Sequence, residues 1–372
     1  MKIVFTGGGT GGHLFPLISV ARELNNLLGT TTGEVPEIIF LGPDDFPIEI
    51  LSQENIKVST IIGAKLRRYF SFKNFLDMFI KLPIAFIQAF YKLFILMPDL
   101  VFSKGGYGSV PVVMVAWIFR IPVIIHESDA ISGLANRIGS KFAKRVAISF
   151  EESAKYFNAK KTAFVGNPIR WGLLNGDKEE ALRNLHLEAG LPILFIYGGS
   201  QGAQVINNII IEDIKNLLSR YEVIHQCGEL NYNEVQELLK KVLPEGAPQN
   251  YHLYPFMLEN QMKDAYVASD LIIGRAGSGT IFEIAALGKP SIIIPLNGSA
   301  SEHQRQNAID YARTGAAEII EQDNLTASLL ASETQRIISD KVVMLKMANA
   351  ALDFSKPDAA KKIAEEMLSL IK

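Results

Sequence analysis

The chain has 372 residues, of which 48% are hydrophobic and 20% are charged, and its formal net charge at pH 7 is −2. This composition indicates a globular protein large enough for two domains, and the near-neutral charge argues against a nucleic-acid-binding protein. The single cysteine, Cys227, excludes a disulfide framework and a cysteine-rich metal site, and it favours a reducing cytoplasm. Because Met1 leads straight into an apolar run, we expect no signal peptide.

Runs rich in Ile and Val alternate along the chain with stretches whose apolar residues have helical spacing. This alternation predicts an α/β fold of parallel sheets with crossover helices, in which ligands bind beyond the carboxyl ends of the strands. One helix is predicted over residues 205–218. The predicted strands cover residues 1–5, 37–41, 100–103, 123–126, 146–149, 194–197, 271–274 and 291–295.

A predicted strand runs into a glycine turn four times, twice in each half of the chain. The turns cover residues 7–12, 105–108, 198–202 and 274–279. The repetition predicts two similar α/β domains, with a boundary near 165–176, where Gly166-Asn167-Pro168 interrupts regular structure. The expected domains are 1–165 and 166–350. A last segment, 351–372, carries a helix that can pack on either half, including back on the N-terminal domain.

The first glycine turn runs from Gly7 to Gly12 and ends at His13, between a predicted strand and a predicted helix. Glycine lets the backbone turn tightly and approach a phosphate, while a helix N-terminus offers unpaired N–H donors. A plain phosphate cradle needs no ionisable group, so His13 indicates proton transfer as well as binding. An imidazole with its ordinary pKa near 6.5 can accept a proton at neutral pH.

The glycine turns of the second half repeat this pattern. Ser200, in Gly198-Gly199-Ser200-Gln201-Gly202, can bind a phosphate or cap the next helix, and both interpretations stay open. In the fourth turn, Arg275 can place positive charge near a diphosphate, and Glu283 can accept hydrogen bonds from two ribose hydroxyls. Thr280-x-x-Glu283 is also a capping box, which is the interpretation that this segment alone favours.

Two polar segments follow other predicted strands. Residues 302–308 are rich in amide groups that suit sugar hydroxyls and an acetamido group, although a polar helix start on the surface gives the same pattern. Residues 126–129, His-Glu-Ser-Asp, end an apolar strand, where a site and a capped turn fit nearly equally. We expect no metal site, since no two His residues are spaced for one helix face.

Residues 64–97 combine basic side chains with interleaved aromatic ones, and Asp77 is the one acidic residue among them. This pattern suits an anionic membrane surface, but a core helix preceded by a basic loop produces it too. We expect a half-buried helix, with lipid contact at 66–75 and, because charges interrupt the apolar run, no membrane span. The membrane-associating candidates are Lys65, Arg67, Arg68, Phe70, Phe72, Lys73 and Phe75.

Together these segments resemble one family over nearly the whole chain. The motifs occur in the family's order: GGGTGGH at 7–13, GGYGS at 105–109, HES at 126–128, GLANR at 133–137, GNPIR at 166–170, GGSQGA at 198–203, RAGSGTIFE at 275–283 and HQRQNA at 303–308. Each motif alone is weak, whereas the set in register is specific. The chain resembles the MurG family, the UDP-N-acetylglucosamine–N-acetylmuramyl-(pentapeptide) pyrophosphoryl-undecaprenol N-acetylglucosamine transferases of peptidoglycan synthesis.

The resemblance implies a GT-B fold, with two Rossmann-like domains whose parallel sheets face an interdomain cleft. It implies a hexosyltransferase without a cofactor. Transfer of N-acetylglucosamine from UDP-N-acetylglucosamine to the 4-hydroxyl of the muramyl sugar of lipid I would be inverting and metal-independent, and would give lipid II. The implied donor-binding residues are Thr10, Gly11, Gly12, Arg170, Ser200, Asn207, Met257, Arg275, Ser278, Gly279, Thr280, Ile281, Phe282, Glu283, Gln304 and Asn307.

The same resemblance gives the N-terminal domain the lipid I site, with His13 as general base. The family commonly has Gln-Asn where this chain has Ser128-Asp129, so Asp129 either contacts sugar or acts with His13. The implied location is peripheral, on the anionic cytoplasmic face of the inner membrane, with cell-wall synthesis and division proteins as candidate partners. The implied acceptor-binding residues are Gly9, Gly105, Gly106, Tyr107, Glu127, Asp129 and Asn136.

Three alternatives compete with this interpretation. A related glycosyltransferase that acts on diacylglycerol would have no anion for the glycine turns at 7–12 and 105–108. A nicotinamide-dependent dehydrogenase would need an acidic residue at the end of its second strand, whereas Glu37 begins that strand. A non-enzymatic scaffold on the membrane surface would have no need of His13 or Glu283, and both are present.

Overall fold

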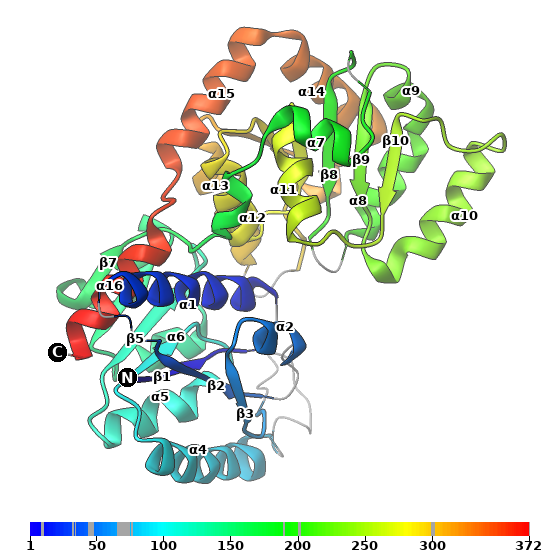
Figure 1. The fold of residues 1–372 in the computed structure, drawn as a ribbon. Helices are drawn as coiled ribbons and strands as arrows, with labels where there is room; N and C mark the ends of the chain where they lie inside the picture. The colour runs from blue at the N-terminus through cyan, green and yellow to red at the C-terminus, as the bar shows by residue number, and fades with distance from the viewer. Residues whose placement is uncertain are drawn as a thin grey trace. The chain divides into compact units, whose positions relative to one another are not determined.

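A computed structural model describes residues 1–8, 11–31, 33, 35–43, 48–64, 75, 77–188, 190–199, 202–298 and 302–371. The chain forms two compact units (Figure 1). The first comprises Met1–Ile169 together with Lys356–Lys372, and the second comprises Arg170–Ser355. Each unit contains one parallel β-sheet with helices on its faces, as the alternating pattern of the sequence predicts.

The first unit contains a seven-stranded parallel sheet with the order β3-β2-β1-β4-β5-β6-β7. Its strands are β1 (Lys2–Thr6), β2 (Glu37–Gly42), β3 (Lys57–Thr60), β4 (Leu100–Ser103), β5 (Val123–Glu127), β6 (Arg145–Ile148) and β7 (Thr162–Phe164). The predicted strands of this half are confirmed. Neither β3 nor β7 is predicted from the sequence, because these edge strands are short and partly exposed and so lack an apolar run.

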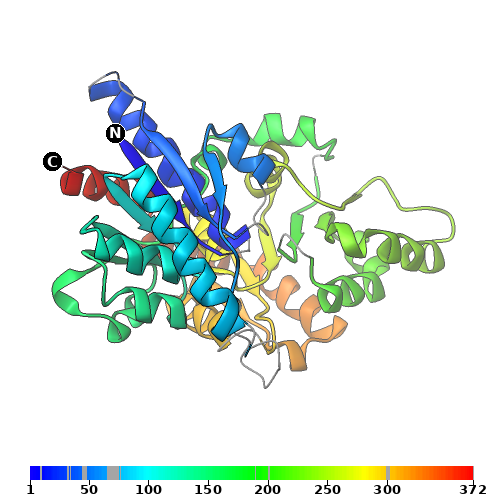
Figure 2. The same ribbon diagram turned by 90° about the horizontal axis from the view of Figure 1, so that it is seen from below.

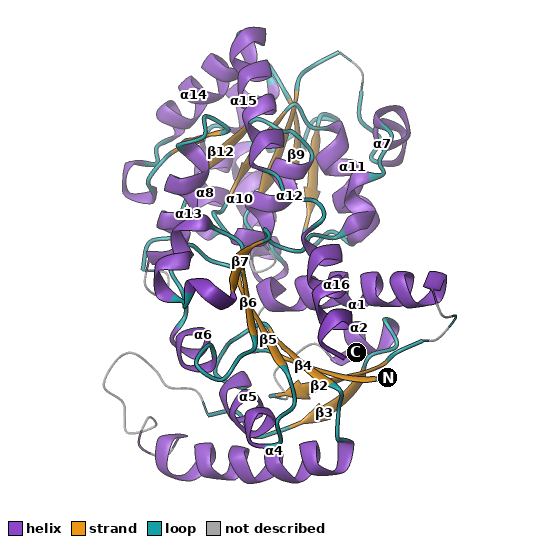
Figure 3. Cartoon of the chain, turned by 90° about the vertical axis from the view of Figure 1, so that its left-hand side faces the viewer, coloured by secondary structure: helices purple, strands orange, loops and turns teal. Residues whose placement is uncertain are grey.

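Alternate residues of the central strands face two separate cores. Ile3 and Phe5 belong to one core, with α1 (Gly11–Thr31) and α16 (Ala359–Ile371), while Val4 belongs to the other. That second core includes α4 (Leu82–Leu96) and α5 (Ser109–Ile118). Figure 3 shows the two helix layers on opposite sides of the strands. The remaining helical segments of this unit are α2 (Ile48–Gln53), η1 (Asp77–Lys81), α6 (Leu134–Gly139), η2 (Glu151–Tyr156) and η3 (Ala159–Lys161).

The last helix of the chain belongs to the first unit. Ile363, Ala364 and Met367 of α16 are buried in the same core as Leu17 and Leu24 of α1. At the surface, Arg145 Nε donates to Glu366 Oε1 over 2.6 Å. The two ends of the chain consequently lie close together in this unit, as Figures 1 and 2 both show.

The second unit contains a six-stranded parallel sheet with the order β10-β9-β8-β11-β12-β13. Its strands are β8 (Ile193–Tyr197), β9 (Glu222–Gln226), β10 (Tyr251–Tyr254), β11 (Leu271–Gly274), β12 (Ser291–Ile293) and β13 (Ala317–Ile319). Its helices are α7 (Lys178–Asn184), α8 (Gln204–Glu212), α9 (Ile214–Leu218), α10 (Tyr232–Val242), α11 (Glu259–Ala268), α12 (Ser278–Ala286), α13 (His303–Ala312), α14 (Ala327–Ser339) and α15 (Lys341–Phe354).

One predicted helix of this unit is divided in two. The sequence analysis expected one helix over 205–218, but the structure ends α8 at Glu212 and begins α9 at Ile214. Asp213, between them, leaves helical geometry with ψ 9°, and its carboxylate accepts from Asn216 Nδ2 over 3.1 Å. Aspartate competes with the helical backbone in this way, whereas the apolar spacing that guided the prediction continues across the break.

The strand order reverses once in each sheet, between β1 and β4 and between β8 and β11. In open parallel sheets, the connections leave such neighbouring strands in opposite directions, which opens a crevice at their carboxyl ends. All four glycine turns of the sequence follow these four strands. Each unit therefore brings two glycine turns to its own switch point.

Candidate active site

In the first unit, the turns after β1 and β4 touch through their backbones. A Cβ on Gly106 would lie 2.8 Å from both N and Cα of Gly8. Gly105 and Gly106 have φ values of +84° and +85°, in the left-handed region that favours glycine. The glycines thus allow a contact that no side chain could enter. Gly9 and Thr10, both predicted to bind a ligand, lie outside the described residues.

His13 lies in the first turn of α1, against both glycine turns. Its Nδ1 hydrogen-bonds the carbonyl oxygen of Gly8, and its Cε1 would lie 3.3 Å from a Cβ on Gly106. Because a carbonyl oxygen only accepts, we assign the ring proton to Nδ1, which leaves the basic lone pair on Nε2. The backbone thus fixes both the tautomer and the orientation of the imidazole.

A buried lysine that the sequence analysis missed lies directly before Gly105. The side chain of Lys104 is 1% exposed. Its ammonium donates to His126 Nδ1 (2.6 Å), to Ser128 Oγ and to Asn167 Oδ1 (3.3 Å). These three acceptors match the three N–H groups of an ammonium. The signal in the sequence that could have identified it is a lysine placed directly after an apolar strand.

His126, at the end of β5, completes this polar cluster. Its Nε2 lies 2.9 Å from the Gly166 carbonyl oxygen and 3.2 Å from Ser149 Oγ. We therefore assign the proton to Nε2 and the lone pair to Nδ1, which accepts from Lys104. Burial, and then the charge of Lys104, lowers the pKa of His126 well below its ordinary value. The imidazole is consequently neutral and structural.

The carboxylate of Glu127 holds the loop after β5. Its Oε2 accepts from Ser132 Oγ, the Gly133 N–H and Asn136 Nδ2 at 2.9–3.0 Å, and its Oε1 accepts from the Asp129 N–H at 3.1 Å. Burial, followed by the charge of Asp129, raises the pKa of Glu127, and these hydrogen bonds oppose the shift. The capped turn, one of the two interpretations left open for residues 126–129, is therefore present, and it leaves the other interpretation untested.

Two other predicted acceptor residues lie beside the turn after β4. Asn136 Oδ1 would lie 2.5 Å from a Cβ on Gly105, and the Tyr107 ring would lie 2.9 Å from a Cβ on Gly63. Asn136 is 5% exposed, and its Nδ2 donates to the Glu127 carboxylate. The structure thus gathers His13, Gly105, Gly106, Tyr107, Glu127 and Asn136 at the carboxyl edge of the first sheet.

In the second unit, the turn after β8 packs closely against Cys227, which directly follows β9. Gly199 and Gly202 have φ values of +88° and +75°, and a Cβ on Gly202 would collide with the carbonyl oxygen of Cys227. Ser200 lies outside the described residues. Gly202 needs its glycine both for backbone conformation and for space.

A buried hydrogen-bond network lies under this turn. Asn207, predicted to bind the donor, is 1% exposed. Its Nδ2 donates to the Cys227 carbonyl oxygen (2.9 Å), and its Oδ1 accepts from His225 Nε2 (3.0 Å). His225 Nδ1 lies 2.8 Å from the Tyr251 hydroxyl, and burial lowers the pKa of His225 to about 3. Both ends of the Asn207 amide are therefore engaged within the unit.

Glu283 forms a buried ion pair instead of a helix cap. Arg170 Nε and Nη2 donate to the two carboxylate oxygens over 2.8 and 2.9 Å, and the Tyr266 hydroxyl donates to Oε2 over 3.1 Å. Burial favours a lower pKa for Arg170, but the charge and hydrogen bonds of Glu283 outweigh burial and raise it. The capping-box prediction is wrong, because α12 begins at Ser278 and Glu283 lies beyond its first turn.

The remaining predicted donor residues lie around the ends of β11 and β12. Arg275 Nη1 donates to the carbonyl oxygens of Ile294 and Pro295, both at 3.2 Å, and burial lowers the pKa of Arg275 to about 10. Asn307 Nδ2 donates to the Ala276 carbonyl oxygen over 3.2 Å. Gln304 Oε1 accepts from the Leu296 N–H over 3.1 Å. These bonds fasten the loops after both strands to each other and to α13.

Other predicted residues of the second unit are mainly buried. Met257 precedes α11 and is 1% exposed, while Ile281 and Phe282 are 0% and 1% exposed within α12. Ile281 also donates its N–H to the Gly277 carbonyl oxygen. The first turn of α12, from Ser278 to Thr280, therefore offers the backbone donors of this helix.

The apolar surface of the first unit lies on α4. The candidates at 65–74 fall outside the described residues, whereas Phe75 is 62% exposed and its ring lies 4.5 Å from that of Phe79. Small or central residues of α4, Ala85, Ala89 and Leu93, face the core. The outward residues form what we call the α4 face: Phe75, Met78, Phe79, Ile80, Ile84, Ile87, Phe90, Tyr91, Phe94, Ile95 and Met97, with Trp117 and Ile118 of α5 also exposed.

By length and composition alone, Asp77–Leu96 is long and apolar enough to cross a membrane, although the charges within it led to the expectation of no span. Only 17% of its apolar window is buried within the protein. The charges that argued against a span are satisfied locally: Lys81 Nζ lies 2.8 Å from Asp77 Oδ1, and Lys92 Nζ donates to Ser59 Oγ over 2.8 Å. The core contacts of Ala85, Ala89 and Leu93 nevertheless make this segment part of the first unit.

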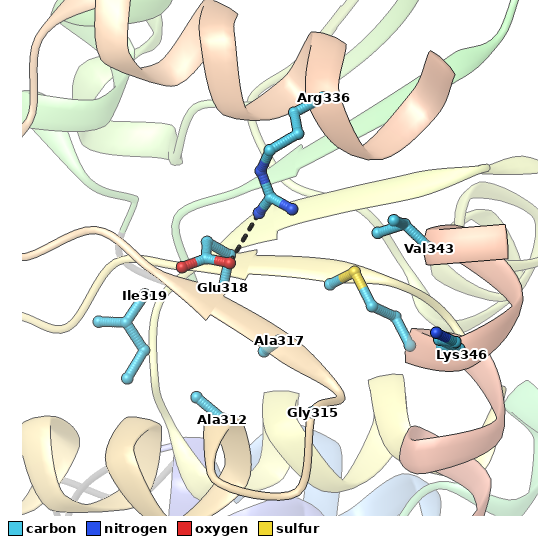
Figure 4. Close-up of a pocket in the computed structure, with 9 residues that line it drawn as sticks. Ala312, Gly315, Ala317, Glu318, Ile319, Arg336, Val343 and Lys346 are labelled. Carbon is cyan, nitrogen blue, oxygen red and sulfur yellow. Dashed lines mark hydrogen bonds and ion pairs between the residues drawn. The ribbon is translucent and has the colours of Figure 1, made fainter. Parts of the chain in front are cut away.

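A pocket of about 490 Å3 lies elsewhere, between β13, α14 and α15 (Figure 4). Arg336 lies there within 2.7 Å of Glu318. Gly315, Lys346 and Met347 also line it. No residue predicted for the active site contributes to this pocket. Within the described ranges, no three His, Cys, Asp or Glu side chains are grouped so as to hold a metal ion.

Both halves of the chain match one family of proteins. Residues 3–148 match the glycosyltransferase family 28 N-terminal domain, and residues 193–363 match the family's C-terminal domain. A Treponema denticola protein named UDP-N-acetylglucosamine--N-acetylmuramyl-(pentapeptide) pyrophosphoryl-undecaprenol N-acetylglucosamine transferase is 38% identical over 95% of this chain and 94% of its own length. A protein of the same name from Thermodesulfovibrio yellowstonii is 36% identical over 100% of this chain and 99% of its own.

Solved structures with similar folds include a crystal structure of MurG from Acinetobacter baumannii. It has a TM-score of 0.75 and 27% identity, with 99% of each chain covered. A UDP-N-acetylglucosamine 2-epimerase from Neisseria meningitidis, bound to UDP-N-acetylglucosamine, has a TM-score of 0.68 with 99% of this chain and 100% of that chain covered. At 17% identity, the second likeness concerns the fold alone.

We expect Gly106→Ala to destabilise the first unit, because the new Cβ would meet the Gly8 backbone at a residue with φ +85°. The free energy of unfolding, measured in urea, should fall by roughly 1–3 kcal/mol. Gly133→Ala is the matched control, since Gly133 has φ −67° and no atom within 4 Å of the added carbon. Equal stability of the two variants would contradict the contact between the glycine turns.

Proposed function

The chain belongs to glycosyltransferase family 28 and, within it, to the MurG family, and from that premise we propose that it transfers N-acetylglucosamine from UDP-N-acetylglucosamine to lipid I. The product is lipid II, a precursor of peptidoglycan. The observation that carries the proposal is identity of 36–38% over nearly the full length of the chain and of its curated relatives. The transfer inverts the anomeric centre and proceeds without a metal ion.

We propose that the second unit binds the UDP-sugar. The carboxylate of Glu283 is oriented by Arg170 and Tyr266. Its Oε2 already accepts two hydrogen bonds, whereas its Oε1 accepts one, from Arg170 Nε, and has a further lone pair for a ribose hydroxyl. The N–H groups of Ser278, Gly279 and Thr280 begin a nine-residue helix and suit a diphosphate. Ser200 and the backbone near Met257 belong to the same proposal, as contacts for the diphosphate and for uracil.

The N-acetylglucosamine moiety is assigned to α13. Gln304 and Asn307 are one helical turn apart, and their amides already fix the loops after β12 and β11. Asn207, in contrast, acts indirectly. Its buried amide bonds His225 and the Cys227 carbonyl oxygen, against which Gly202 packs, so it holds the turn at Gly202 in place beside the diphosphate.

The first unit is assigned to the acceptor. The turns at Gly8 and at Gly105–Gly108 present backbone N–H groups at the switch point, where the diphosphate of lipid I would lie. Tyr107, Asn136 and Asp129 border the same edge, and Glu127 holds its loop. A diacylglycerol acceptor, the second candidate, has no anion for these turns.

The chemistry follows from the tautomer of His13. The 4-hydroxyl oxygen of the muramyl sugar attacks the anomeric carbon, the bond from that carbon to UDP breaks, and His13 Nε2 takes the hydroxyl proton. The negative charge that develops on UDP is stabilised by the N-terminus of α12 and by Arg275. A single displacement from the opposite face inverts the anomeric configuration.

The proposed reaction is tested by UDP release from UDP-N-acetylglucosamine in EDTA, with and without a synthetic lipid I analogue. Release only with the analogue, together with an N-acetylglucosaminyl product, is expected. If UDP is released only when diacylglycerol is added, the acceptor is diacylglycerol and not lipid I. If the folded protein does not bind UDP-N-acetylglucosamine, the assignment of a nucleotide-sugar donor is wrong. If EDTA abolishes UDP release, the reaction requires a metal ion.

His13→Ala should lower kcat with the lipid I analogue by roughly 100-fold or more, because a general base commonly contributes at least that factor. The dissociation constant of the donor should stay unchanged, since the proposal assigns UDP-N-acetylglucosamine to the second unit and His13 belongs to the first. His186→Asn is the matched control, because His186 is exposed in the second unit and its φ of +54° suits asparagine. Near-normal turnover of the His13 variant would exclude His13 as the base.

We further propose peripheral binding of the first unit to an anionic membrane through the α4 face. A soluble protein seldom exposes so many contiguous large apolar side chains, and the basic residues at 65–73 adjoin them in sequence. Since Ala85, Ala89 and Leu93 pack into the core, the helix lies on the bilayer instead of crossing it. Lipid I, which is anchored in that bilayer, then reaches the same unit.

Ile87→Glu should weaken binding to vesicles that contain anionic phospholipid by roughly tenfold or more, measured by co-sedimentation. The change loses burial of a 69% exposed apolar side chain and adds a charge of the wrong sign. Leu230→Glu, at a 90% exposed apolar residue of the second unit, is the control and should bind as the unaltered protein does. Equal binding of both variants would remove the α4 face as the membrane contact.

A further inference from the structure

The ammonium of Lys104 is enclosed at the carboxyl edge of the first sheet. Its three hydrogen-bond acceptors come from two segments, His126 and Ser128 after β5 and Asn167 in the chain that leaves β7. The lysine itself directly follows β4 and is followed at once by Gly105 and Gly106. One side chain thus ties three segments of the acceptor unit together.

The stem of Lys104 also lies against the first glycine turn. A Cβ on Gly7 would lie 3.5 Å from the Lys104 Cβ, in ordinary van der Waals contact. The next glycines along the two turns, Gly8 and Gly106, meet through their backbones. The lysine consequently adjoins both turns that the proposed function assigns to the acceptor diphosphate.

We propose that Lys104 is a positioning residue for the transfer, whose buried ammonium holds the two glycine turns in register and supplies fixed positive charge beneath the acceptor diphosphate. The inference rests on the proposed function, because it presumes a diphosphate at these turns. No ligand reaches the ammonium itself, since its three N–H groups are already engaged. It acts through the turns and through its electric field, which the protein interior screens less than water does.

The surrounding charges make this field sensitive to pH. Among the described residues, the titratable groups that face the cluster are His126, Glu127 and Asp129 on the β5 side and His13 on α1. Burial lowers the pKa of Lys104 to about 7, while Glu127 and Asp129 act in the opposite direction. Its charge is therefore present at acid pH and is lost as the pH rises through about 7. His13 gives the opposite pH dependence, because a general base must be deprotonated and its contribution therefore increases as the pH rises.

The test compares Lys104→Met and Lys104→Gln with the unaltered protein, using a soluble lipid I analogue. For both variants, kcat/KM for the analogue should fall by roughly tenfold or more, with the KM for UDP-N-acetylglucosamine changed by less than about twofold. Glutamine retains hydrogen-bond donors but has no charge, so its failure to restore activity identifies the charge as the active feature. Lys161→Met, at a lysine that donates only to backbone carbonyls of Ser140 and Ala143, is the matched control.

The pH profile separates positioning from general damage. In the unaltered protein, kcat/KM for the analogue should decline above pH about 7, and both Lys104 variants should lack that decline while they keep the rising limb at lower pH. Activity of Lys104→Met equal to that of the unaltered protein would overturn the inference. So would full recovery in Lys104→Gln, or a retained decline above pH 7. If the unaltered protein itself transfers nothing to the lipid I analogue, the proposed function fails instead.

Discussion

The close approach of two glycine turns is the constraint on which the proposed acceptor site depends. Reversal of strand order places β1 beside β4, so the chain segments that leave both strands must share one small space. Gly8 and Gly106 resolve the conflict by direct backbone contact, and the Gly8 carbonyl then orients His13. Packing, tautomer and proton acceptor are therefore consequences of a single topological feature.

The second unit also holds its functional groups in fixed orientations, but it does so by other interactions. Its turn at Gly202 presses on the Cys227 carbonyl, which also accepts from Asn207. The Glu283 carboxylate accepts from Nε and Nη2 of Arg170, and this two-point contact fixes its orientation. In the first unit, the Gly8 carbonyl oxygen orients His13, the proposed base. In the second unit, the ion pair with Arg170 orients Glu283, the proposed hydrogen-bond acceptor for the ribose. Both groups are oriented before any substrate arrives.

The sequence predicts those features that depend on residues close together in the chain. The apolar strands, the glycine turns and His13 at a helix start were all evident, because each pattern spans only a few residues. Prediction failed where a distant residue decides the outcome. Thr280-x-x-Glu283 satisfies the rule for a capping box, yet Arg170 takes the Glu283 carboxylate. Lys104 was not predicted as a site residue, since its acceptor Asn167 lies far along the chain.

Buried charge and exposed apolar surface in the first unit share one explanation. A lysine in the core is unfavourable unless its charge is needed there, and an uncovered row of phenylalanines is unfavourable unless lipid covers it. An acceptor with a diphosphate head and a polyprenyl tail would meet both features within one unit: the head over Lys104 and the glycine turns, and the membrane that holds the tail against the α4 face. The polarity of the proposed acceptor thus matches the two features of this unit that folding alone leaves unexplained.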